Sequence, residues 1–255
     1  MRRTYLCALT VALAPALGVA GCGSGTAPQG PLTAVSNTVG TGADRAWVIQ
    51  PSRGDPISVV VFLHGLGDQA ETTPVHHRPW LDHLARSGSY VIYPRYELHP
   101  GGPLGVKHAA TGMLTALDQV DPGRKLPLVL AGYSRGGGMA VELAALAPAV
   151  GLAPKAVFGV LPADMDPGLD YRAISPATQV LFLVGDMDTV VGDAGARHLT
   201  ERLLAAGFPR VNVHTQVVRS PLGFEATHLS VLSDANAARR AYWLPLDRVV
   251  AAARS

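Results

Sequence analysis

Short apolar runs recur along this chain and alternate with longer segments of helical character. The runs are rich in leucine and β-branched residues and are mostly unbroken by polar residues, as expected of strands buried on both faces of a sheet. They cover residues 45–50, 57–65, 89–95, 126–132, 155–163, 178–186 and 211–218. Helices are expected from near Pro79 and over residues 106–120, 134–147, 194–207 and 239–253. This succession predicts an α/β fold with a mostly parallel central sheet and helices on both of its faces.

The run at 126–132 leads directly into Gly-Tyr-Ser-Arg-Gly, with Ser134 at its centre. With 28 glycines in the chain, a serine between two glycines is weak evidence by itself. Its position is more informative, because a sharp turn between a strand and a helix lifts a serine oxygen above the sheet, where it can act as a nucleophile. The backbone N–H of Arg135 would then lie at a helix start, which favours an anion. A phosphate-binding helix start is the alternative, but the loop lacks both the P-loop ending and the dinucleotide pattern of glycines.

A serine nucleophile needs a base, and the base needs a carboxylate that orients it. Two acids compete after the run at 178–186. We favour Asp188, which lies deeper in the turn, and we expect Asp186 to shape the loop as an Asx-type turn residue. His228 follows the last predicted strand and is the expected base, which gives the chain order Ser, Asp, His. The other histidines fit this role less well, because they lie inside predicted elements or precede the serine.

The sequence His-Gly-Leu-Gly at 64–67 ends another predicted strand. The backbone N–H of Leu66 is the expected second donor to an oxyanion, beside that of Arg135. We expect His64 to pack or hydrogen-bond beneath this loop rather than to act as a base.

Together these motifs resemble the α/β-hydrolase superfamily, with HGLG (64–67) as the oxyanion loop and GYSRG (132–136) as the turn that carries the nucleophile. GDMD (185–188) and ATHLS (226–230) correspond to the acid and histidine loops. The resemblance covers about residues 44 to 253 and is greatest to compact, dienelactone-hydrolase-like and lipase-like members. It implies an α/β-hydrolase fold without a large cap domain, hydrolysis of small-molecule carboxylic esters, and no metal or organic cofactor.

Three functions remain open at this point. The first is a carboxylesterase or lipase, the second an acyltransferase or peptidase with the same triad, and the third a non-catalytic binding lipoprotein. Segments 161–175 and 96–106 leave predicted strand ends and are expected to form walls of the pocket. They are rich in turn residues, and we expect them to set the size of the acyl or alcohol group.

The N-terminus combines basic residues with a short apolar stretch and ends in Val-Ala-Gly-Cys, which resembles a bacterial lipobox. We predict a signal peptide at 1–21, a lipidated Cys22 with a flexible tether at 22–43, and a hydrolase domain at 44–255. The chain would be exported and anchored by lipid to the extracytoplasmic face of the cell membrane. A plain secretory signal that happens to end in cysteine is the alternative.

Cysteine content and charge exclude several classes of protein. The chain contains only Cys7 and Cys22, so after cleavage no thiol pair, cysteine-ligated zinc site or cysteine nucleophile is available. Loss of Arg2 and Arg3 leaves 19 basic residues, which equals the number of acidic residues. We therefore expect no binding of nucleic acid, and we expect a monomer.

Overall fold

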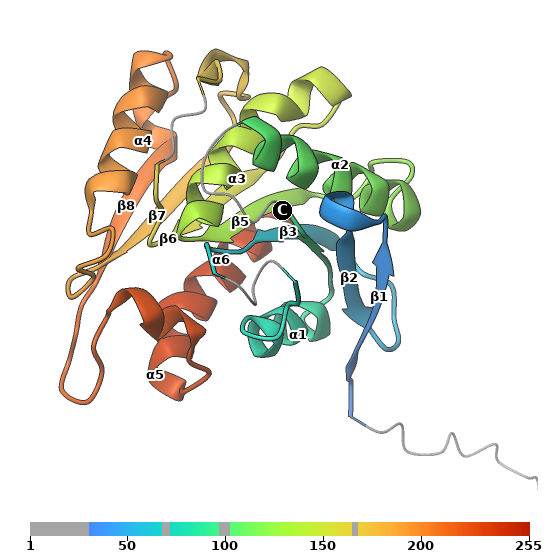
Figure 1. Ribbon diagram of the computed structural model, residues 1–255, viewed down its shortest axis with the longest axis horizontal. Helices are drawn as coiled ribbons and strands as arrows, with labels where there is room; N and C mark the ends of the chain where they lie inside the picture. Colours follow the sequence, from blue (N-terminus) through green and yellow to red (C-terminus); the bar gives the residue numbers. More distant parts are fainter. Residues whose placement is uncertain (1–30, 68–71, 97–102, 165–167) are drawn as a thin grey trace, which may run out of the picture. The chain divides into compact units, whose positions relative to one another are not determined.

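A computed structural model describes residues 31–67, 72–96, 103–164 and 168–255, and Leu32–Ser255 form a compact unit. Its centre is an eight-stranded sheet with the strand order β1-β2-β4-β3-β5-β6-β7-β8 (Figure 1). The strands are β1 (Ala34–Val39), β2 (Ala46–Pro51), β3 (Ser58–Leu63), β4 (Ser89–Pro94), β5 (Leu128–Tyr133), β6 (Ala156–Val160), β7 (Gln179–Gly185) and β8 (Val213–Val218). From β4 to β8 all neighbours run parallel, whereas β2 is antiparallel to both β1 and β4. The predicted mostly parallel sheet is confirmed.

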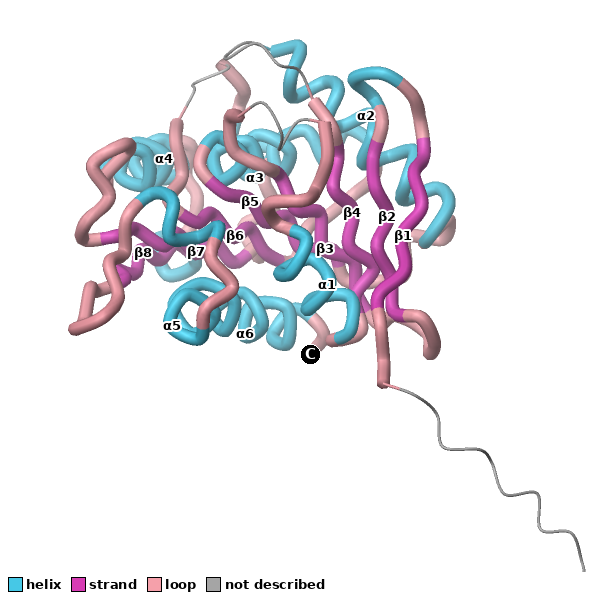
Figure 2. The backbone as a smooth tube through the Cα atoms, turned by 60° about the horizontal axis from the view of Figure 1, so that its bottom comes forward, coloured by secondary structure: helices cyan, strands magenta, loops and turns pink. Residues whose placement is uncertain are grey.

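Helices cover both faces of this sheet, as predicted (Figure 2). The helices α2, α3 and α4 lie on one face, and α1, α5 and α6 lie on the other (Figures 1 and 2). Their bounds are α1 (Arg78–Arg86), α2 (Pro103–Val120), α3 (Arg135–Leu146), α4 (Ala194–Ala205), α5 (Asn236–Ala238) and α6 (Leu244–Ala253), with a π-helical segment, Arg239–Trp243, between α5 and α6. Short 3-10 helices occur at Gly42–Asp44, Ala147–Val150, Tyr171–Ala173, Arg210–Asn212 and His228–Leu232.

The sheet separates two apolar cores, and alternate residues of each central strand point into opposite ones. In β3, Val59, Val61 and Leu63 join the core beneath α2 and α3, while Val60 and Phe62 join the core beneath α1 and α6. All six residues of β3 are buried, which explains why its sequence after Ser58 is entirely apolar. A sheet that is packed on both faces provides a rigid support for loops at its carboxyl edge.

The first strand corrects the predicted domain boundary. Residues 22–43 were expected to be a tether, but β1 pairs with β2 from Ala34 opposite Pro51 to Val39 opposite Ala46. The sequence of β1, AVSNTV, contains no apolar run, and its four central residues are exposed at the edge of the sheet. The folded domain therefore begins at or before Ala34 rather than at residue 44.

Among the described residues, no helix has both the length and the apolar character needed to cross a membrane. Cys22 and the predicted signal peptide lie outside these residues.

Candidate active site

Ser134 occupies a strained turn between β5 and α3. Its backbone has φ of 55° and ψ of −124°, a conformation that costs a residue with a side chain about 1–2 kcal/mol. Neighbouring backbone holds the turn in place, because the N–H of Ser134 donates to the carbonyl of Val160 over 3.0 Å. The carbonyl of Ser134 in turn accepts hydrogen bonds of 2.9 Å from the N–H groups of Gly137 and Ala163. The turn is therefore fixed to the end of β6.

Glycine is required on both sides of this turn because backbones meet there. A Cβ atom at Gly132 would lie 2.1 Å from the carbonyl oxygen of Gly136. A Cβ atom at Gly136 would lie 2.1 Å from the carbonyl oxygen of Leu63, at the end of β3. The first turn of α3 thus packs directly on the strand that leads into the HGLG loop.

The structure brings the three side chains predicted for the triad together. Nε2 of His228 lies 3.0 Å from Oγ of Ser134, and Nδ1 of His228 lies 2.9 Å from Oδ2 of Asp188. His228 and Asp188 are both buried, whereas Ser134 is partly exposed. His228 follows β8, Asp188 follows β7 and Ser134 follows β5, so their contact results from the parallel arrangement of these strands.

The second carboxylate oxygen of Asp188 is also satisfied. Oδ1 accepts hydrogen bonds from the N–H groups of Val190, at 2.9 Å, and of Val191, at 3.2 Å. These bonds direct Oδ2 toward His228, where a carboxylate favours the tautomer that carries its proton on Nδ1. Nε2 is then free to accept the proton of the serine hydroxyl.

Asp186, the competing acid, lies in a different environment. Its carboxylate accepts hydrogen bonds from the N–H and the hydroxyl of Ser220, and the hydroxyl bond in particular lowers the pKa of Asp186. Oγ of Ser220 accepts a further bond of 2.9 Å from the N–H of Ala226. Asp186 therefore shapes the segment that leads to His228, and it forms no hydrogen bond with the imidazole itself.

Tyr133 contributes to the site in a way that the sequence analysis did not identify. Its hydroxyl donates a hydrogen bond of 2.9 Å to the carbonyl of His228, and the two rings lie 5.1 Å apart. Burial raises the pKa of Tyr133 above its ordinary value, so the hydroxyl remains a proton donor. An aromatic residue directly before the serine was the only signal in the sequence.

The segments expected to form an oxyanion hole flank Ser134. A Cβ atom at Gly65 would lie 3.1 Å from Cβ of Ser134, so the residue before Leu66 touches the turn that carries Ser134. Leu66 itself has a half-exposed side chain. Arg135 is the first residue of α3, so its N–H has no acceptor within the helix.

His64 lies beneath the HGLG loop and is fully buried. Its ring stacks on that of Tyr96 with 3.9 Å between centroids, and its Nδ1 lies 2.7 Å from the carbonyl oxygen of Gly65. Burial lowers the pKa of His64 to about 3, so the ring is neutral at ordinary pH. It has the packing role expected from the sequence.

The described part of the predicted wall at 161–175 is attached to α4. Asp164 forms an ion pair of 2.8 Å with Arg202, whose guanidinium also lies 4.5 Å from the centroid of the Tyr171 ring. Residues 165–167 of this wall and 97–102 of the opposite wall lie outside the described part of the chain.

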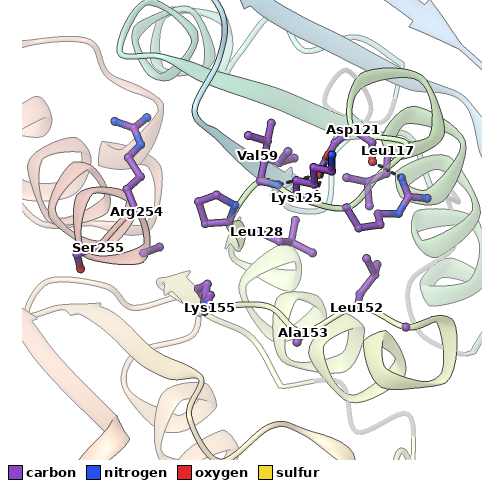
Figure 3. A pocket seen from close by; sticks show the side chains of 15 residues that line it. Val59, Leu117, Asp121, Lys125, Leu128, Leu152, Ala153, Lys155, Arg254 and Ser255 are labelled. Atoms are coloured by element: carbon purple, nitrogen blue, oxygen red, sulfur yellow. Dashed lines mark hydrogen bonds between the residues drawn. The ribbon is translucent and has the colours of Figure 1, made fainter.

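A cavity of about 400 Å³ lies at the amino ends of the central strands (Figure 3), whereas Ser134 follows the carboxyl end of β5. Its lining includes Val59 and Leu128, near the amino ends of β3 and β5, together with Arg254 and Ser255 of the C-terminus. It is therefore separate from the residues around Ser134. Within the described ranges, no group of three or more His, Cys, Asp or Glu side chains is placed to hold a metal ion.

Comparison with known proteins gives structural matches only. No protein-family model matches the chain, and no curated protein matches it. Among solved structures, esterase B from Lactobacillus rhamnosis, inhibited by a tributyrin phosphonate, is 17% identical with a TM-score of 0.65, over 87% of this chain and 86% of that one. An esterase from the archaeon Pyrobaculum calidifontis is 19% identical with a TM-score of 0.63, over 87% and 84% of the two chains. Carboxyl esterase 2 from the fungus Tuber melanosporum is 17% identical with a TM-score of 0.61, over 89% and 88%.

The sheet order, the helix layers and these likenesses establish the α/β-hydrolase fold for this chain. The predicted fold class is confirmed.

Proposed function

We propose that this protein is a serine hydrolase that cleaves carboxylic esters through an acyl-enzyme intermediate. One observation carries the proposal, namely the hydrogen-bonded series from Asp188 through His228 to Ser134 at the carboxyl edge of the sheet. A packing role alone gives no reason for a buried acid and a buried histidine to converge on a serine in a strained turn. Several solved structures to which this chain is similar are esterases, which agrees with the proposal.

In the first half of the reaction, Oγ of Ser134 attacks the ester carbonyl while Nε2 of His228 takes its proton. Asp188 stabilises the imidazolium that forms. The N–H groups of Leu66 and Arg135 donate to the tetrahedral oxyanion, each contributing about 3 kcal/mol to the transition state. Collapse of this intermediate releases the alcohol, which leaves with the proton from His228.

In the second half, His228 removes a proton from water, and the resulting hydroxide attacks the acyl carbon. The bond to Oγ breaks, His228 returns the proton to Ser134, and the carboxylic acid leaves. Apart from the ester and one water molecule, the groups that take part in these steps are side chains and backbone groups of this chain.

The test combines an active-site probe with a substrate series. A fluorophosphonate should label the wild-type protein and fail to label Ser134→Ala. A p-nitrophenyl ester series of increasing acyl length should show turnover that this substitution abolishes, and a p-nitroanilide of the best acyl group should be cleaved much more slowly. Labelling that persists in Ser134→Ala would refute the nucleophile, and equal cleavage of the anilide would favour a peptidase.

We further propose that Cys22 carries a lipid that anchors the protein to the extracytoplasmic face of the membrane. The proposal rests on the sequence Val-Ala-Gly-Cys after an apolar stretch with a basic start. Cell fractionation tests it, since Cys22→Ser should move the protein from the membrane to the soluble fraction. Unchanged membrane retention of this variant would refute the anchor.

A further inference from the structure

The side chain of Arg135 has no part in the ester chemistry above, which uses only its backbone N–H. The side chain is nevertheless buried, with 2% of the residue exposed. Its Nε and Nη1 atoms are without a hydrogen-bond partner, and the ion pairs formed by the described residues do not include it. A buried cation without a counter-ion is rare in folded proteins.

The guanidinium lies against the first turn of α2. A Cβ atom at Gly105 would lie 2.8 Å from Nη2 of Arg135, so glycine makes room for the guanidinium at this position. Cζ of Arg135 lies 5.4 Å from the centroid of the Tyr96 ring. The guanidinium thus lies near both an aromatic ring and the start of an 18-residue helix.

The electrostatic interaction between the Arg135 guanidinium and the start of α2 is unfavourable. The N-terminal turn of a helix carries free N–H groups and a partial positive charge, so a cation is disfavoured there and an anion is favoured. The ring of Tyr96 attracts the cation but supplies no charge. His64, which stacks on Tyr96, is neutral because burial lowers its pKa to about 3. Two positive groups therefore converge here, and the described residues supply no anion between them.

We propose that Arg135 and the first turn of α2 bind a free carboxylate carried by the ester substrate. The inference rests on the proposed function and specifies its substrate class. Because Arg135 directly follows Ser134 in the sequence, we infer that the bound carboxylate belongs to a molecule whose ester lies at Ser134. A guanidinium matches a carboxylate with two parallel hydrogen bonds, and the backbone N–H groups that follow Pro103 in the first turn of α2 add to this match, although Pro103 itself has none. The expected substrates are half-esters of dicarboxylic acids or esters of alcohols that carry an acid.

The experiment compares two esters of similar shape. One is the p-nitrophenyl half-ester of adipic acid, and the other is the same ester with a neutral carboxamide in place of the free carboxylate. We expect wild-type kcat/KM to favour the carboxylate by at least about tenfold, or about 1.4 kcal/mol, since the carboxamide lacks the charge that strengthens hydrogen bonds to the guanidinium. Arg135→Gln should bring this ratio close to one, and Arg135→Lys should keep part of it, because lysine retains the charge without the planar fork.

Arg240→Gln is the matched control. Arg240 is an exposed arginine in the π-helical segment Arg239–Trp243, and its substitution should leave the ratio as in the wild type. A wild-type ratio near or below one would overturn the proposal. So would an Arg135→Gln protein that keeps the wild-type ratio.

A second measurement covers the case in which Arg135→Gln fails to fold. Adipate should then compete with p-nitrophenyl butyrate for the wild-type protein, whereas adipamide and inorganic phosphate should compete weakly or not at all. Equal inhibition by phosphate, or none by adipate, would overturn carboxylate recognition. Failure of the hydrolase proposal is distinguishable, because it removes fluorophosphonate labelling and all ester turnover. If the hydrolase proposal fails, carboxylate binding at Arg135 is still supported only if adipate raises the Tm of the wild-type protein and adipamide does not.

Discussion

At the scale of single residues, Tyr133 links two parts of the site that are 95 residues apart in the sequence. It is the last residue of β5 and precedes Ser134, and its hydroxyl holds the carbonyl of His228. The backbone that presents the nucleophile thus also fixes the backbone of the proposed base. Tyr133 is a positioning residue in this arrangement, because its contact with the reaction passes through His228.

We predict that Tyr133→Phe lowers kcat about fivefold and changes KM little, because one neutral hydrogen bond contributes about 1 kcal/mol. The pH dependence of kcat/KM should also change, since the imidazole loses its fixed orientation, and a purely structural role would not alter that profile. Tyr90→Phe, a partly buried tyrosine near the amino end of β4, is the control. Kinetics on p-nitrophenyl butyrate that match the wild type would contradict the positioning role.

At the scale of elements, the loop after β7 places two nearby acids, Asp186 and Asp188, in different environments. Asp188 is buried against His228, whereas Asp186 is exposed and bound to Ser220. Both follow the same strand within three residues of its end. The loop therefore separates an acid that orients the imidazole from one that holds the neighbouring segment.

We predict that Asp188→Asn lowers kcat about ten-thousandfold, because an amide at this position favours the wrong imidazole tautomer. Asp186→Asn should have a small effect on kcat, since the amide oxygen can still accept a bond from Ser220. Steady-state kinetics of the two variants, with thermal unfolding as a check on folding, would decide between them. Loss of activity in Asp186→Asn alone would show that the wrong acid was chosen.

Elements with a strong apolar pattern could be predicted from the sequence. Strands β2 to β8 each overlap a predicted run, and in β2 to β7 most residues are buried, which leaves a largely apolar sequence. Strand β8 was predicted as well, although four of its six residues are exposed. Strand β1 was missed because its central residues face solvent at the edge of the sheet. The last helix was predicted, but not the π-helical segment Arg239–Trp243 within it, which hydrophobic periodicity does not indicate.

The same distinction holds for the candidate site. The positions of Ser134, Asp188 and His228 could be predicted because each follows a strand, and parallel strand ends meet at one edge. The hydrogen bond from Tyr133 to His228 depends on side-chain geometry between distant segments, which a sequence pattern does not contain. The direction of the Arg135 side chain toward Tyr96 and Gly105 was unpredictable for the same reason.

At the scale of the whole molecule, two neutral histidines are buried close to the site. Burial lowers the pKa of His64 and of His77 from 6.5 to about 3. His77 packs against Phe62 and Tyr133, with ring centroids 5.1 and 5.6 Å away, and His64 and His76 are the titratable groups that lower its pKa further. The unfolded chain binds protons at these histidines between pH 6.5 and 3, and the folded protein does not.

We predict that the free energy of unfolding falls as the pH decreases from 6.5 toward 3, by about 1.4 kcal/mol per pH unit for each of the two histidines. His77→Phe should therefore weaken the dependence on pH in this range. Urea unfolding at several pH values would measure how the free energy of unfolding depends on pH. His198→Gln, on the exposed face of α4, is the control. The same slope in His77→Phe and the wild type would contradict this account.

The turn that carries Ser134 and the segment 161–175 are held in place by different kinds of contact. The proposed triad stands on strand ends whose backbones touch, as where Gly136 meets Leu63, so few substitutions are tolerated there. The described residues of the segment 161–175, by contrast, are joined to α4 by the pair Asp164–Arg202 and by Tyr171. Substitutions in this segment are therefore expected to change the range of substrates without disturbing the backbone contacts that hold Ser134.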